Sequence, residues 1–327
     1  MIGRLLTALD RRLGAASFAK RALDKVFPDH WSFMLGEIAL YSLLVLVVTG
    51  VFLTFFFDPS QAATVYQGSY SPLAGADVSQ AYRSVVGISF DVRAGLVMRQ
   101  THHWAALVFV GAIVVHLGRV FFTGAFRKPR DINWIVGVTL LILAIANGFT
   151  GYSLPDDTLS GTGLRVAYSF ALSIPLVGEW LAFLVFGGEY PAEGMIPRLY
   201  SVHIMVVPIL IGALLALHLG LVWHQKHTQF PGKGRTEHNV VGSRLWPTYA
   251  MKSVGLFFVV AAVLESTRCS SWGRTASKNP RSSLILSASR WLRPAVSMRI
   301  RSRSFMRSIA STSWAGDIAT SSGTSMI

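Results

Sequence analysis

The chain has 327 residues, of which 52% are hydrophobic and 14% charged, and this composition is typical of an integral membrane protein. Its formal net charge of +14 would indicate nucleic-acid binding in a soluble protein. Here the basic residues lie mostly between apolar spans and in a C-terminal tail, so we expect no nucleic-acid partner. The single cysteine, Cys269, excludes an internal disulfide and a thiolate cluster, so any metal must be held mainly by histidine.

The N-terminal segment, residues 1–30, alternates Leu and Phe with Arg and Lys, a pattern typical of an amphipathic helix on the membrane surface. It has no uninterrupted apolar core before a small-residue cleavage site, so it is not a signal peptide. The apolar stretches after it predict four membrane spans and a weaker fifth. We expect these spans at about 36–57, 99–123, 134–154, 199–223 and 249–264. Gly, Pro and short apolar runs in 156–197 predict short interfacial helices there.

The distribution of Lys and Arg predicts which span ends face the cytoplasm. These residues gather in the segments 1–30, 125–133 and 225–252. The polar loop 58–98 holds only Arg83 and Arg93, and 155–197 holds only Arg165. Because cytoplasmic loops carry the excess of positive charge, we expect a multi-pass protein of the cell membrane with a cytoplasmic N-terminus.

Histidines stand near both ends of the second and fourth spans. His102 and His116 are 14 residues apart, which is about 21 Å along a helix and about 40° short of four whole turns. Their imidazoles therefore project to nearly the same side at two depths, with His102 near the outer surface. His203 and His218 repeat the arrangement over 15 residues. Pairing His102 with His203 and His116 with His218 gives two sites, each with two axial imidazoles for one haem iron.

Two other interpretations of the histidines are hydrogen bonds between neighbouring helices and the proton relay of a transporter. Glycines favour haem. Gly36 and Gly50 in the first span are 14 residues apart, as are Gly137 and Gly151 in the third. Glycine lets a flat ring or another backbone approach closely, although small residues also serve ordinary helix packing in membranes. The same interval on two helices favours flat rings at two levels.

Two arginines flank the histidines of the second span. Arg99 and Arg119 would meet the negatively charged propionates of haem at the membrane edges, or else snorkel to lipid headgroups. His103 points about 100° away from His102, so we interpret it as a packing or hydrogen-bonding residue.

Together these features resemble cytochrome b of the bc1 and b6f complexes. The resemblance rests on Arg-x-x-His with a second His 14 residues later and then x-x-Arg, on the paired glycines, on Gly-Tyr-Ser-Leu-Pro at 151–155 and on His203 with His218. Three stretches resemble the actinobacterial cytochrome b subunit in particular: FFTGAFRKPR at 121–130, LPDD at 154–157 and QKHTQFPGKGRTEHNVVG at 225–242. The resemblance covers about residues 20–264.

The resemblance implies an all-α membrane protein. A four-helix dihaem cytochrome b bundle would occupy 31–225, with an N-terminal interfacial helix before it and a cytoplasmic loop and the start of a fifth helix over 226–264. It further implies a subunit of a quinol:cytochrome c oxidoreductase that moves electrons from menaquinol through two b haems with proton translocation. The outer histidine pair would hold the low-potential haem near the quinol-oxidising site. The inner pair would hold the high-potential haem near the quinone-reducing site.

The implied partners are a Rieske iron–sulfur subunit, a cytochrome c subunit, an aa3-type oxidase, membrane lipid and a second copy of the chain in a homodimer. At the inner end of the fourth span, His224, Lys226 and His227 are candidates for donating hydrogen bonds or protons to a quinone. The alternative for them is a solvated basic helix end. The alternative function is a dihaem membrane anchor of another respiratory oxidoreductase, against which the matched second and fourth spans argue.

The character of the sequence changes after Leu264. Residues 265–327 are rich in Ser and Arg and predict no further span, so we expect either an out-of-frame segment or a disordered basic extension. The family carries a Pro-Glu-Trp-Tyr-like element of the outer quinol pocket in later helices, and this sequence has none. We therefore expect haem binding without a complete outer quinol site in this chain.

Overall fold

The computed structural model describes residues 10, 14–28, 30–229, 232–234, 236 and 240–276. Nearly all of them belong to one compact unit, Met1–Ser271. The expected interfacial segment contains a helix, α2 (Ala15–Leu23), while residues 1–9 and 277–327 lie outside the described part of the chain.

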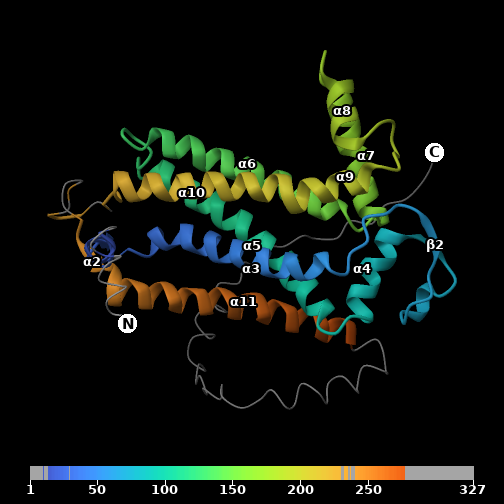
Figure 1. Ribbon diagram of the computed structural model, residues 1–327, viewed down its shortest axis with the longest axis horizontal. Coiled ribbons are helices and arrows are strands. Elements are labelled where there is room, and N and C mark those ends of the chain that lie inside the picture. Colours follow the sequence, from blue (N-terminus) through green and yellow to red (C-terminus); the bar gives the residue numbers. More distant parts are fainter. Residues whose placement is uncertain are drawn as a thin grey trace, which may run out of the picture. The chain divides into compact units, whose positions relative to one another are not determined.

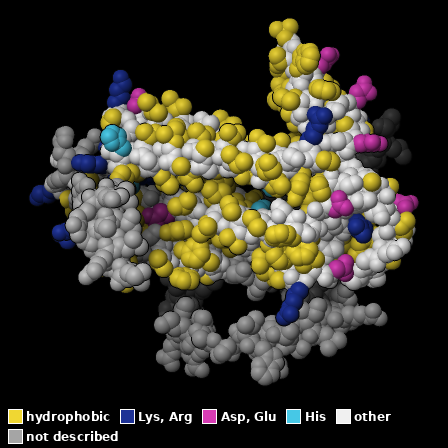
Figure 2. Space-filling model, in the orientation of Figure 1, with side chains coloured by type: hydrophobic (Ala, Val, Ile, Leu, Met, Phe, Trp, Pro, Cys, Tyr) yellow, Lys and Arg dark blue, Asp and Glu magenta, His cyan; other side chains and the backbone are white. Residues whose placement is uncertain are grey.

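In this described part, five helices are long and apolar enough to cross a membrane, which confirms the expected number of spans (Figure 1). Their ranges are Trp31–Thr54, Gly95–Phe122, Asp131–Ser153, Met195–Gln225 and Leu245–Leu264. The first three contain the helices α3 (Leu35–Thr54), α5 (Gly95–Phe122) and α6 (Asp131–Ser153). The fourth consists of α9 (Met195–Ser201), a π-helical turn η3 (Val202–Val206) and α10 (Val207–Gln225). Figure 2 shows hydrophobic side chains over these helices and charged side chains mainly toward the ends.

The spans pack as two helix pairs, α3 against α5 and α6 against α10, and α5 also contacts α6. Small side chains let membrane helices approach closely, and alanines dominate the contact. One buried cluster joins α3, α5 and α6 through Ala39, Phe109, Ala112, Ile113 and Ala144. Therefore α5, which carries His102 and His116, lies beside α3 with its two glycines. The span of η3 and α10, which carries His203 and His218, lies beside α6 with the other two.

The fifth span was expected to stop at Leu264, but the helix that contains it continues. The helix α11 runs from Ala250 to Ala276, into the stretch where the sequence predicted a disordered or out-of-frame tail. Hydropathy marks the part of a helix that suits a membrane, whereas the Glu, Ser, Thr and Arg residues that follow are compatible with a helical backbone. Val260 and Leu264 of α11 pack with Ala105 of α5, so this helix is part of the packed bundle.

The two long connections contain more structure than simple loops. In 58–98 a two-stranded antiparallel sheet precedes a helix whose first turn is capped by the Ser79 hydroxyl, which accepts from the Tyr82 amide. These elements are β2 (Ala63–Val65), η2 (Ser71–Leu73), β3 (Asp77–Ser79) and α4 (Gln80–Phe90). In 156–197 the expected short helices are α7 (Thr158–Leu172) and α8 (Gly178–Phe186), and a capping box of Asp157 with Ser160 starts α7.

A second small sheet ties the segment before α3 to the segment before α11. Strand β1 (Val26–Pro28) pairs antiparallel with β4 (Gly242–Arg244). The short helices η1 (Trp31–Met34) and η4 (Leu245–Tyr249) follow these strands and lead into α3 and α11. One cavity is lined by Phe27 of β1, Phe33 of η1 and Tyr249 of η4 together with His116 and His218. These elements therefore lie at the same end of the bundle as the second histidine pair.

Candidate functional site

The structure brings the four histidines together in the two expected pairs. The ring centres of His102 and His203 are 6.3 Å apart with planes at 72°, and those of His116 and His218 are 6.5 Å apart with planes at 78°. A metal–imidazole bond is about 2 Å long and each ring centre lies about 1 Å behind its nitrogen, so two axial ligands of one metal have ring centres about 6 Å apart. Both pairs have the spacing that one iron between two imidazoles requires.

The unequal histidine intervals are reconciled by the π-helical turn η3. Fifteen residues of α-helix turn about 60° beyond four whole turns, so the interval from His203 to His218 alone predicts divergent imidazoles. The turn Val202–Val206 absorbs one extra residue, which leaves both imidazoles facing α5. Pro208 lies just after this turn and lacks the N–H that would continue regular α-helical bonding. This turn was not predicted from the sequence, although Pro208 and the 15-residue interval were signals for it.

Each of the four expected glycines lies against one of the four histidines. A Cβ atom at Gly36 would be 3.3 Å from Cε1 of His116, and one at Gly50 would be 3.2 Å from Cε1 of His102. On the other helix pair, Gly137 faces His218 at 3.6 Å. Gly151 faces His203 so closely that a Cβ atom would overlap its ring, with Nδ1 at 2.9 Å. Gly36, Gly50 and Gly151 thus make room for the imidazoles themselves, whereas Gly137 leaves an ordinary contact distance to its ring.

The two arginines take different partners. Arg99 donates from Nε to the Ser89 hydroxyl at 2.9 Å. The guanidinium of Arg119 lies over the Phe33 ring, 3.8 Å from its centre, and its buried Nε has no hydrogen-bond partner among the described residues. A buried guanidinium N–H without a partner is costly, and a carboxylate is the acceptor that suits it best. Arg119 therefore fits the propionate of a haem held by the inner pair.

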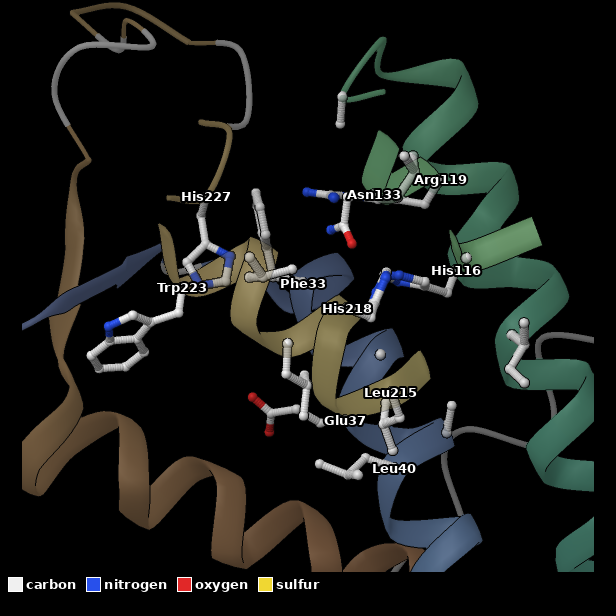
Figure 3. A pocket seen from close by; sticks show the side chains of 18 of the residues that line it. Phe33, Glu37, Leu40, His116, Arg119, Asn133, Leu215, His218, Trp223 and His227 are labelled. Atoms are coloured by element: carbon white, nitrogen blue, oxygen red, sulfur yellow. The ribbon is translucent and has the colours of Figure 1, made fainter. Parts of the chain in front are cut away.

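A cavity of about 630 Å³ adjoins the inner imidazole pair, and one part of its wall is basic (Figure 3). Lys226 and His227 line it together with Lys25 and Arg119, whereas His224 is exposed and does not belong to its lining. Burial and the neighbouring Lys25, Arg119 and Arg130 lower the pKa of His227 to about 4. This ring is therefore neutral at pH 7 and has both a donor and an acceptor nitrogen. Of the candidates His224, Lys226 and His227, the last two therefore line the cavity.

Another part of this cavity wall is a carboxylate that the sequence analysis missed. Glu37, next to Gly36 on α3, accepts a short hydrogen bond from the Tyr249 hydroxyl and a 2.6 Å bond from the Ser253 hydroxyl. Tyr41 shares a further short hydrogen bond with Ser253. Because these contacts join residues more than 200 positions apart, periodicity does not reveal them. An acidic residue in an otherwise apolar span was the available signal.

His103 lies off the paired rings, as its helical position predicts. Its ring makes an edge contact with the adjacent Trp104, with centres 6.0 Å apart. The ring is exposed, so His103 lies away from the paired histidines.

The helical bundle and its two pairs of facing imidazoles fit a haem-binding membrane protein. Residues 107–277 match the family model described as cytochrome b (N-terminal)/b6/petB, and the chain belongs to this family, as the sequence predicted. It is similar to a respiratory complex III chain described as hyperthermophilic, with a TM-score of 0.64 at 19% identity over 79% of this chain and 65% of that one.

Sequence relatives give the same result in more detail. The chain is 56% identical over 265 residues to the cytochrome bc1 complex cytochrome b subunit of Mycobacterium tuberculosis H37Rv, covering 81% of this chain and 48% of the relative. It is 55% identical over 256 residues to the corresponding subunit of Streptomyces coelicolor, covering 78% and 47%. The chain spans about half the length of these relatives.

Proposed function

We propose that this chain is the haem-binding part of a cytochrome b subunit in a bc1-type quinol:cytochrome c oxidoreductase. It moves electrons from quinol across the membrane through two b haems while protons are translocated. The observation that carries the proposal is that two pairs of imidazoles face each other, with ring centres 6.3 Å apart in one pair and 6.5 Å apart in the other. One glycine lies next to each of the four rings. A proton relay or an ordinary helix contact does not need this matched spacing at two levels.

Histidines and arginines would hold haem in different ways, the histidines at the iron and the arginines at the propionates. His102 and His203 would hold the outer haem, and His116 and His218 would hold the inner one. Bound haem supplies one-electron redox chemistry. Arg119 offers its unpaired buried Nε to an inner propionate, and Arg99 stands at the corresponding outer position.

The part of the inner cavity beside Lys226, His227 and Tyr249, next to the space that a haem held by His116 and His218 would fill, suits the head group of a quinone, and menaquinone is the substrate that the family resemblance implies. A quinone is a flat apolar ring with two carbonyl oxygens, so it needs apolar walls and hydrogen-bond donors. Lys226 and His227 are donors on the basic side, and the Tyr249 hydroxyl is held by Glu37 elsewhere in the wall. Reduction of the quinone takes up two electrons and two protons. The neutral ring of His227 is suited to passing such a proton.

The subunits around this chain follow from the same proposal. A Rieske iron–sulfur subunit and a cytochrome c subunit would accept electrons on the outer side, an aa3-type oxidase would associate with them, and the complex would be a homodimer. The relatives are named as subunits of cytochrome bc1 complexes, which supports a multi-subunit assembly.

Haem stoichiometry tests the proposal. The chain in membranes should contain two b-type haems, seen as reducible bands in the visible spectrum and counted against protein. His116→Ala and His218→Ala should each leave one haem, because each removes one axial ligand of the same iron. His103→Ala is the matched control on the same helix and should keep both. Two haems in His116→Ala, or the loss of one in His103→Ala, would show that the ligands are assigned wrongly.

A further inference from the structure

Each imidazole of the outer pair contacts a threonine. The Oγ1 atom of Thr49 is 2.9 Å from Nδ1 of His102, and Oγ1 of Thr150 is 3.3 Å from Nδ1 of His203. Each threonine directly precedes the glycine that faces the same ring, and each lies 53 residues before its histidine. The same arrangement is therefore built twice, once on α3 with α5 and once on α6 with α10.

The surrounding carbonyls fix where the protons lie. The hydroxyl of Thr49 donates to the carbonyl of Val45 at 2.7 Å, so its oxygen is left to accept from Nδ1–H of His102. Nδ1 of His203 is 2.9 Å from the carbonyl oxygen of Asn147, which can only accept. Both rings therefore carry their proton on Nδ1 and keep the lone pair of Nε2 for a metal.

In the inner pair, His116 has no such acceptor for its Nδ1–H among the described residues. Nδ1 of His116 is buried and has no hydrogen-bond partner in the part of the chain that the structure describes. The outer imidazoles thus stand in an accepting environment that His116 does not share.

We infer that Thr49 and Thr150 are positioning residues that lower the midpoint potential of the outer haem. The inference rests on the proposed ligation of that haem by His102 and His203. An imidazole whose Nδ1–H is donated becomes a more basic ligand, which stabilises ferric over ferrous iron and lowers the potential. The two threonines thereby favour electron transfer from the outer haem toward the inner one.

Redox titration of the chain in membranes tests this role. Thr49→Val keeps the side-chain volume and removes the acceptor of His102, so it should raise the midpoint potential of the outer haem and leave the inner one unchanged. Thr150→Val removes the more distant of the two acceptors of His203 and leaves the Asn147 carbonyl, so it should raise the same potential by less. Thr49→Ser keeps a hydroxyl and should titrate like the unaltered chain. Thr101→Val is the matched control, because the Thr101 hydroxyl is buried beside His102 and has no hydrogen-bond partner among the described residues.

Titrations in the His116→Ala background, where one haem remains, assign the shift to the outer site. Two haems with unchanged potentials in both valine variants would overturn the inference, as would an equal shift in Thr101→Val. If a valine variant loses haem, the serine variant still decides, because a shifted potential in Thr49→Ser would contradict the role of the hydroxyl. The proposed function fails differently, through a haem count that does not depend on His102.

Discussion

At the scale of single residues, replacing a glycine beside a histidine by alanine should affect haem binding most. Gly151→Ala places a methyl group against the ring of His203, whose Nδ1 is already fixed by the Asn147 carbonyl. The ring cannot retreat without losing that hydrogen bond, so we expect the outer haem to be lost or strongly reduced. The measurement is the ratio of haem to protein, which should fall from two toward one.

Two other glycines of α6 are the controls for this prediction. Gly148→Ala meets no atom within 4 Å and should keep both haems, with a helix that is more stable by about 1 kcal/mol. Gly137→Ala meets His218 only at ordinary contact distance, 3.6 Å, and should also be tolerated. Equal haem contents in all three variants would mean that close approach at Gly151 is not what the glycine provides.

At the scale of secondary-structure elements, the π-helical turn η3 predicts an unusual tolerance to deletion. Deleting Val206 shortens the interval from His203 to His218 to the 14 residues found in α5, and an ordinary α-turn can replace the π-turn. The helix on either side then stays in place, so both haems should remain. Haem content and the two midpoint potentials, measured in membranes, check this expectation.

Deletion of Gly111 from α5 is the matched control. This residue has open space around it, so its side of the helix loses no contact. However, α5 has no π-helical turn that could absorb the deletion, so His116 rotates by about 100° relative to His102. One haem should be lost. If both deletions had the same effect, the π-turn would not be what compensates for the longer interval.

Much of this architecture was readable from the sequence, because membrane spans and helical periodicity depend on local patterns. The 14-residue intervals of His102 with His116 and of the glycines each reflect one straight helix. The contact of Glu37 with Ser253 was not readable, since it depends on how α11 docks on α3. The threonines before Gly50 and Gly151 were visible as a repeated Thr-Gly pair, but their role depends on a ring from another helix.

At the scale of the whole molecule, the charges of the connections predict the direction in which electrons cross the membrane. The connection after α5 carries Arg127, Lys128 and Arg130, whereas the segment 58–98 has few basic residues. The latter should therefore face outward, which makes the His102 level the outer one. Gly75 and Lys128 are exposed positions in these two connections and accept insertions without disturbing a span.

Alkaline phosphatase, which is active only outside the cytoplasm, should be active when inserted after Gly75 and inactive after Lys128. A fluorescent protein that matures only in the cytoplasm should give the opposite pattern, and this separates topology from a failure of expression. Insertion after Gly188, in the connection between α8 and α9, should behave like Gly75 because two spans separate the two connections. If the phosphatase were active only after Lys128, the bundle would have the opposite orientation in the membrane. The cavity beside His116 and His218 would then face outward and would be the site of quinol oxidation, not of quinone reduction.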